Sequence, residues 1–106
     1  PPAIGMGIAN YMSRRSRVMS GSTDDKFFGE AGEWLITYCK EVLATKHYDY
    51  LIFGHRHLPI DFSLKQGARY INLGDWIRYY TYAVFDGTEL KLCARYPEQE
   101  NKIYRQ

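Results

Sequence analysis

The chain has 106 residues, the size of one small domain that can bury a modest hydrophobic core. Its formal net charge of +2 is too small to indicate nucleic-acid binding by itself, so we expect no nucleic-acid partner. No stretch of the chain approaches the roughly 20 apolar residues that a membrane-spanning helix requires. The two cysteines, Cys39 and Cys93, lack a CxxC spacing, and we expect reduced thiols in a cytoplasmic protein.

The first segment, residues 1–24, combines a predicted helix with a basic loop. Three arginines, Arg14, Arg15 and Arg17, follow one another with no acidic residue before Asp24. Guanidinium groups bind phosphate oxygens bidentately, so these arginines are candidates for binding an anionic substrate or an anionic membrane surface. A solvated helix end, favoured by the helix dipole, is equally compatible with the same residues.

The clearest predicted element is a helix over residues 25–46, where apolar side chains recur at helical spacing. Ser22 or Thr23 is expected to cap this helix. The charged side chains of the segment, among them Glu33, are expected to face solvent on the opposite side of the helix.

Everything after Asp49 is predicted to be β structure. A turn is expected at Gln66-Gly67, and Asp86-Gly87 is a strong hairpin signal. The polar tail, residues 97–106, is expected to pack poorly. Apolar residues, most of them alternating with polar ones, predict strands at residues 50–53, 58–64, 70–73, 79–85 and 90–96.

The tetrapeptide Gly54-His55-Arg56-His57 directly follows the first predicted strand. Two imidazoles separated by one residue at a strand end favour metal coordination over packing. Gly54 tolerates positive φ, and we expect it to turn the chain and bring both rings to the same rim. Two nearby nitrogen ligands fit a pair of metal ions about 3.5–4 Å apart, the arrangement used for phosphate-ester and pyrophosphate hydrolysis. The alternative is a pair of solvent-exposed loop histidines.

The run Ile52-Phe53-Gly54-His55-Arg56-His57-Leu58-Pro59 resembles the last metal-binding motif of the calcineurin-like metallophosphoesterases. Residues 70–76 and 81–87 resemble the final strands of one branch, the UDP-2,3-diacylglucosamine pyrophosphatases of lipid A synthesis in Bacteroidetes-type bacteria. The resemblance implies an α/β fold, a four-layer α/β/β/α sandwich around two metal ions, usually manganese. It also implies that His55 and His57 each bind one ion, and that Arg14, Arg15 and Arg17 lie in a helical cap over the acyl chains of the substrate.

The other metal-binding motifs of that family, Asp-x-His, Gly-Asp-x-x-Asp and Gly-Asn-His-Asp/Glu, do not occur in this sequence. We therefore expect a C-terminal portion of a larger enzyme, with residues 25–96 forming the second half of the catalytic domain. Such a portion is expected to be inactive alone and to self-associate. The intact protein is expected to hydrolyse a nucleotide-sugar lipid at the cytoplasmic side of the inner membrane. The alternative is a small non-catalytic α+β binding module in which the histidines hold one metal ion.

Four further residues are open to interpretation. Asp75 is expected to be a turn residue that hydrogen-bonds its own backbone rather than a metal ligand. Asp61 is a candidate third ligand of a mononuclear site, although its place in an alternating strand favours solvent exposure. Arg56 points either outward or toward a phosphate, and Trp76 is a candidate neighbour of the substrate.

Overall fold

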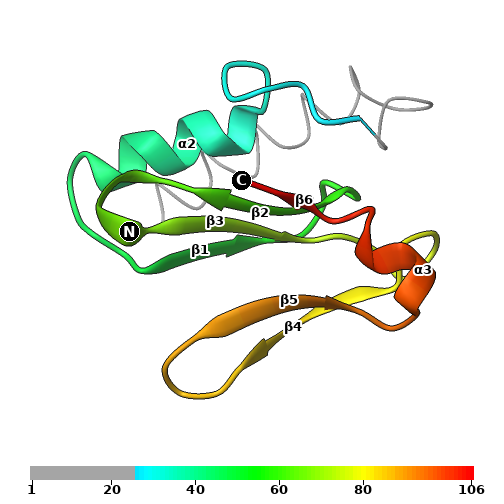
Figure 1. Cartoon of the computed structure of the whole chain (residues 1–106). Helices are drawn as coiled ribbons and strands as arrows, with labels where there is room; N and C mark the ends of the chain where they lie inside the picture. Colours follow the sequence, from blue (N-terminus) through cyan, green and yellow to red (C-terminus); the bar gives the residue numbers. More distant parts are fainter. Residues whose placement is uncertain (1–25) are drawn as a thin grey trace.

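The computed structural model describes residues 26–106, which are arranged in three layers (Figure 1). Helix α2 (Trp34–Leu43) covers one face of a four-stranded sheet. A hairpin of β4 (Thr81–Phe85) and β5 (Leu90–Ala94) packs against the other face. The sheet has the strand order β1-β3-β2-β6, and its strands are β1 (Tyr50–Phe53), β2 (Pro59–Ser63), β3 (Arg69–Leu73) and β6 (Tyr104–Arg105).

The mixture of helix and strand confirms the expected α/β character, and the predicted strands all occur within one or two residues of their expected bounds. The β region is more mixed than expected. β3 pairs parallel with β1 and antiparallel with β2, and β6 pairs parallel with β2. The three layers are compatible with a four-layer sandwich, which stays a prediction.

The helix predicted over residues 25–46 begins later than expected, at Trp34. The N–H groups of Gly32 and Glu33 donate to the carbonyl oxygen of Gly29 at 3.1 and 3.0 Å, forming a separate turn before the helix. Gly29 has a φ of +84°, a left-handed conformation that no regular α-helix contains. The N-cap of α2 is therefore Glu33, and the caps expected at Ser22 or Thr23 lie outside the described residues.

Two cores hold the layers together. Side chains of α2 pack against the sheet, and fully buried side chains of this kind contribute about 1.5–3 kcal/mol each. Burial raises the pKa of the Cys39 thiol to about 12, which makes this thiol an inert part of the core. The first core contains Trp34, Leu35, Ile36, Cys39, Leu43, Leu51, Ile60, Phe62 and Tyr70, and the second contains Ile71, Leu90, Leu92 and Ile103.

The expectation that residues 97–106 pack poorly is wrong. A short helix, α3 (Pro97–Glu100), leads into β6, and Ile103 between them is only 6 % exposed. The Ser63 N–H donates to the Gln106 carbonyl at 2.7 Å, and the ring of Tyr104 stacks on Phe27 with centroids 3.8 Å apart. A strand of two residues has no periodicity, so the sequence pattern could not reveal this pairing.

Within residues 26–106, no helix is long and apolar enough to cross a lipid bilayer. Cys39 and Cys93 are both free thiols, which confirms the expectation that they form no disulfide with each other.

Candidate metal centre

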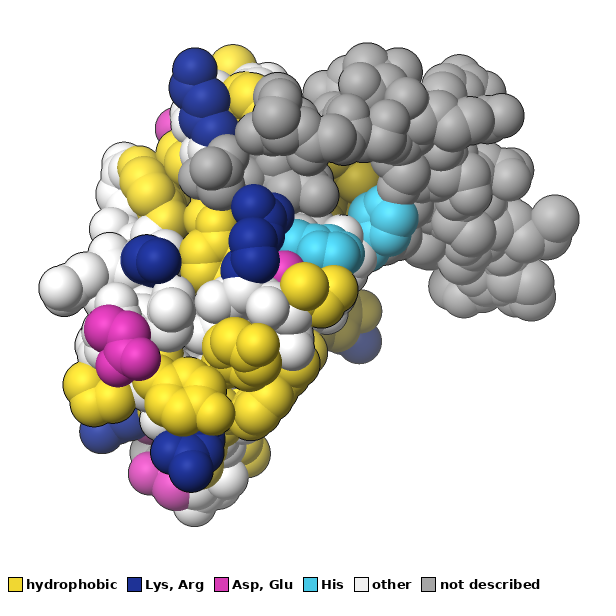
Figure 2. All heavy atoms as spheres, turned by 90° about the vertical axis from the view of Figure 1, so that its right-hand side faces the viewer, with side chains coloured by type: hydrophobic (Ala, Val, Ile, Leu, Met, Phe, Trp, Pro, Cys, Tyr) yellow, Lys and Arg dark blue, Asp and Glu magenta, His cyan; other side chains and the backbone are white. Residues whose placement is uncertain are grey.

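Both candidate ligands lie on the loop that joins β1 to β2, just beyond the C-terminal end of β1. Figure 2 shows histidine side chains next to one another at the surface of this end of the molecule, with basic and acidic side chains beside them. His55 is exposed and the side chain of His57 is 41 % exposed. Both side chains can therefore be reached from solvent.

The loop turns at His55 rather than at Gly54 as expected. His55 has a φ of +71°, and the Arg56 N–H donates to the Gly54 carbonyl across it at 2.8 Å. This is a three-residue γ-turn in its rare positive-φ form. A non-glycine residue held in such a conformation is uncommon, and strained residues of this kind cluster at functional sites.

Arg56 lies between the two histidines and points inward. Its Nε donates to Glu33 Oε1 at 3.2 Å and its Nη2 to Glu33 Oε2 at 3.3 Å, and both side chains are less than 5 % exposed. Arg56 also donates to the Lys26 carbonyl and stacks on the ring of Phe28, 5.3 Å from its centroid. Arg56 therefore anchors the loop to the start of α2. The expectation that Glu33 faces solvent is wrong.

His57 is oriented by Asp75, a residue in the turn between β3 and β4. Its Nδ1 lies 3.1 Å from Asp75 Oδ2. An ionised carboxylate can only accept hydrogen bonds, so Nδ1 carries the proton and a neutral His57 keeps its lone pair on Nε2. Metal-binding histidines have this arrangement, in which the second ring nitrogen donates to a carboxylate. A neutral His57 therefore presents Nε2 as a candidate ligand atom.

The other oxygen of Asp75 organises its own turn. Oδ1 accepts the N–H groups of Ile77, Arg78 and Tyr79 at 3.2, 2.9 and 2.9 Å. Burial acts to raise the pKa of the Asp75 carboxyl, but these three donors and the nearby His57 outweigh burial and hold that pKa below its ordinary value. Asp75 is therefore the turn residue that the sequence predicted. Its contact with His57 was not foreseen.

Asn72 stabilises the same region through its side-chain amide, and this role was not predicted from the sequence. Its side chain is fully buried, its Nδ2 donates to the Gly54 carbonyl at 3.3 Å, and its Oδ1 accepts the Gly74 N–H at 3.3 Å. Asn72 therefore ties the histidine loop to the Asp75 turn. The signal in the sequence was a single amide inside the apolar run 70–73.

Of the remaining candidates, Asp61 and Trp76 lie within the described residues. Asp61 is 8 % exposed and its carboxylate accepts from Arg69 Nε at 2.6 Å, so the expectation that Asp61 is exposed is wrong and an arginine already binds it. Trp76 is 57 % exposed and contacts Tyr80 edge-on at 5.7 Å. Arg14, Arg15 and Arg17 lie outside the described residues.

The donor set fits part of a metal site. Imidazole nitrogens are suitable ligands for first-row divalent ions, and His57 has the outer-shell carboxylate that such ligands need. Residues 26–106 contain no group of three histidine, cysteine, aspartate or glutamate side chains that could hold an ion by themselves. The described part of the chain therefore offers two candidate ligands, and a complete site would need further ligands from elsewhere.

The chain resembles part of a known hydrolase. The chain is 41 % identical over 95 residues to a UDP-2,3-diacylglucosamine hydrolase of Porphyromonas gingivalis (strain ATCC BAA-308 / W83). The match covers 85 % of this chain and 36 % of the relative, so the chain spans about a third of that relative's length. No protein-family model matches the chain, and no solved structure matches it. The chain is thus similar to one part of a hydrolase of a nucleotide-sugar lipid.

Proposed function

We propose that this chain is the C-terminal portion of a calcineurin-like metallophosphoesterase that hydrolyses the pyrophosphate of UDP-2,3-diacylglucosamine to UMP and the acylated sugar 1-phosphate. The observation that carries the proposal is the 41 % identity to a UDP-2,3-diacylglucosamine hydrolase. An alignment that covers 85 % of the chain must include its central residues, and it therefore spans the loop with His55 and His57. The prepared Nε2 of His57 adds independent support.

In this proposal His55 and His57 each bind one of two divalent ions. Manganese is the proposed ion, and carboxylate ligands from elsewhere would complete its coordination. The ions supply charge neutralisation at the phosphate oxygens and an activated water. The chain's own residues hold the ligands in place. Asp75 fixes the ring and tautomer of His57, and the Arg56–Glu33 ion pair fixes the loop between the two histidines.

The remaining ligands are proposed to come from a preceding part of a longer protein, in keeping with a relative of which this chain covers 36 %. The alternative proposal is a binding module that holds a single metal ion through the same two histidines. The sequence of a longer protein distinguishes the two proposals. The enzyme requires further metal-binding motifs in that sequence, whereas the binding module requires none.

The test compares three histidine variants of the longest natural protein that carries this chain. His55→Ala and His57→Ala are each expected to abolish manganese-dependent release of UMP and to lower the bound metal per chain. His47→Ala is the matched control, since His47 is an exposed histidine that pairs with Asp49 at 3.1 Å on another loop. Near-normal turnover in either of the first two variants would end the two-metal proposal.

A second proposal concerns Arg14, Arg15 and Arg17, which we place in contact with anionic groups of the substrate or the membrane surface. Its support is their spacing and charge in the sequence. Replacing all three with Gln is expected to raise the Michaelis constant or to weaken binding to anionic vesicles, with stability unchanged. Equal kinetics and equal vesicle binding of the variant and the wild-type protein would show that the three arginines form only a solvated basic segment.

A further inference from the structure

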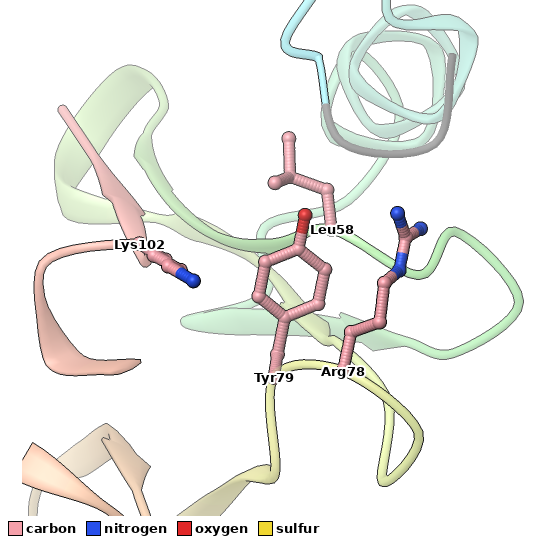
Figure 3. Close-up of a pocket in the computed structure, with 4 residues that line it drawn as sticks. All are labelled: Leu58, Arg78, Tyr79 and Lys102. Atoms are coloured by element: carbon pink, nitrogen blue, oxygen red, sulfur yellow. The ribbon is translucent and has the colours of Figure 1, made fainter. Parts of the chain in front are cut away.

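A hollow of about 480 Å³ lies beside the Asp75 turn. The described residues that line it are Leu58, which follows His57 directly, Arg78 and Tyr79 from the Asp75 turn, and Lys102 from the segment before β6. Figure 3 shows Arg78 and Lys102 on opposite sides of the Tyr79 ring, with Leu58 above it. Segments far apart in the sequence thus bring two cations to one hollow.

The charged residues among the described lining of this hollow all carry positive charge. None of the described lining residues is acidic, whereas both Arg78 and Lys102 are basic. Three other arginines of the fold, Arg56, Arg69 and Arg105, form ion pairs with carboxylates. Within residues 26–106, Arg78 and Lys102 form no such ion pair, and the side-chain contact of Arg78 is with its neighbour Tyr79, whose ring centroid is 5.5 Å away.

The hydrogen bonds of the turn fix the backbone position of Arg78. The N–H groups of Arg78 and Tyr79 both donate to Asp75 Oδ1 at 2.9 Å, so they are not available to a ligand. Recognition in the hollow therefore falls to the side chains. Leu58 and Tyr79 are each 5 % exposed and form an apolar wall, which strengthens the attraction between nearby cations and an anion.

We propose that this hollow is a subsite for a phosphate monoester, bound by the guanidinium of Arg78 and the ammonium of Lys102. A guanidinium fork matches two phosphate oxygens, and an ammonium adds a point charge to the third. The hollow is larger than a phosphate, and its volume leaves room for part of the attached group. The inference rests on the proposed function for the origin of the phosphate, which is either the nucleotide or the sugar.

The position of the hollow fits this role. The same aspartate orients His57 through Oδ2 and sets the Arg78 backbone through Oδ1, so the candidate ligand and the hollow share one support. A phosphate held there would lie next to the histidine loop. Neither the histidine motif nor the cluster of Arg14, Arg15 and Arg17 pointed to Arg78 or Lys102 in the sequence.

The test measures binding in the 106-residue chain with EDTA present, so that neither metal nor hydrolysis enters the result. The ¹⁵N-labelled chain is titrated with inorganic phosphate and followed by NMR. Saturable shifts are expected at the amides of Arg78, Tyr79 and Lys102, and rising salt should weaken them. Shifts that do not saturate, or that spread evenly over all basic residues, would overturn the proposal.

Variants sharpen this measurement. Arg78→Gln and Lys102→Gln are each expected to raise the dissociation constant about tenfold, as the loss of a charge-assisted hydrogen bond does. Arg95→Gln is the matched control, because Arg95 is also exposed and stacks on its neighbour Tyr96 at 5.1 Å but does not line the hollow. An equal loss in the Arg95 variant would show non-specific ion binding and overturn the subsite.

Two further ligands distinguish the source of the phosphate. Tighter binding of UMP than of inorganic phosphate assigns the hollow to the nucleotide side, and tighter binding of glucosamine 1-phosphate assigns it to the sugar side. Saturable phosphate binding by this chain, together with failure of the longer natural protein to hydrolyse the lipid substrate, would refute the proposed function and keep the subsite. Hydrolysis by the longer protein with no loss of activity or of phosphate binding in its Arg78 and Lys102 variants would keep the proposed function and refute the subsite.

Discussion

The imidazole of His57 is held by the carboxylate of Asp75, with Nδ1 and Oδ2 3.1 Å apart across a sequence separation of 18 residues. His57 follows β1 and Asp75 follows β3, and these strands are parallel neighbours in the sheet. Parallel pairing brings the C-terminal ends of both strands to the same edge. A loop histidine thereby gains a fixed orientation before any ligand arrives.

The first prediction concerns the tautomer of His57. In the wild-type chain at neutral pH, the Nδ1–H form is expected to predominate, because the Asp75 carboxylate can only accept. In Asp75→Ala this preference should disappear and the two tautomers should mix. Long-range ¹⁵N–¹H NMR correlations of the ring distinguish the forms. His47 provides an internal control, and an unchanged His57 pattern in the variant would show that Asp75 does not orient the ring.

The second prediction concerns acid stability. The pKa of Asp75 is lowered in the folded chain, so the unfolded chain binds more protons as pH falls toward about 3.9. The stabilisation from Asp75 is therefore complete above that pH and is lost as pH falls through the lower folded pKa. Asp75→Asn should reduce stability at pH 7 and flatten its decline between about pH 5 and pH 2, as measured by urea unfolding.

A second aspartate distinguishes the specific role of Asp75 from the general effect of removing a carboxylate. The pKa of Asp86 is also lowered, mainly by the backbone N–H groups of Glu89 and Thr88, but Asp86 is exposed in the hairpin turn. Asp86→Asn should change the pH dependence without altering the His57 tautomer. Identical tautomer changes in both variants would contradict a direct role of Asp75.

The local features of this fold could be predicted from the sequence. Alternating apolar residues gave the strands, and Asp86-Gly87 gave the hairpin, because turn chemistry and side-chain period act over a few residues. The position of the Gly-His-x-His segment after the first strand was predicted from the same kind of local pattern, although the turn lies at His55 rather than at Gly54. Contacts between distant residues could not be read in this way.

Glu33 shows why. Helical spacing placed it among the solvent-facing charges, yet it is buried against Arg56, 23 residues away. Periodicity reports which side of a helix is polar and says nothing about a partner from another element. The His57–Asp75 contact and the shared hollow of Arg78 and Lys102 depend on sheet register, which the sequence pattern does not contain.

The third prediction concerns this buried ion pair. Removing one partner leaves the other charge uncompensated, so Glu33→Gln and Arg56→Met are each expected to lower the free energy of unfolding by about 3–5 kcal/mol. The exposed pair of Glu30 and Lys40 is the control, and Glu30→Gln should cost less than about 1 kcal/mol. Denaturant unfolding measures the free energy of unfolding of all three variants. Equal losses would show that the buried Arg56–Glu33 pair contributes no more to stability than the exposed pair.

The fourth prediction concerns the strained turn at His55. Both His55→Gly and His55→Ala remove the imidazole, but only glycine adopts a φ of +71° without steric cost. The glycine variant is therefore expected to be more stable than the alanine variant by about 1 kcal/mol. Gly54 lies outside the left-handed region and serves as the reference position, where alanine should cost little. Equal stability of the two His55 variants would mean that the turn relaxes.

The last prediction is that the 106 residues alone do not hydrolyse phosphodiesters or pyrophosphates and do associate with one another. Two neutral imidazoles lack the carboxylates that hard ions such as manganese prefer, and residues 26–106 contain no three-ligand group to complete the site. β1 is an edge strand in the described sheet, and its Ile52 is 47 % exposed, while Val84 and Phe85 of the hairpin are 50 % and 59 % exposed. Open strand edges and apolar patches of this kind favour self-association. Activity assays with added manganese and the mass in solution from light scattering test both parts. Robust metal-dependent turnover by a monomer would show that the chain holds a complete site and that its exposed surfaces need no cover.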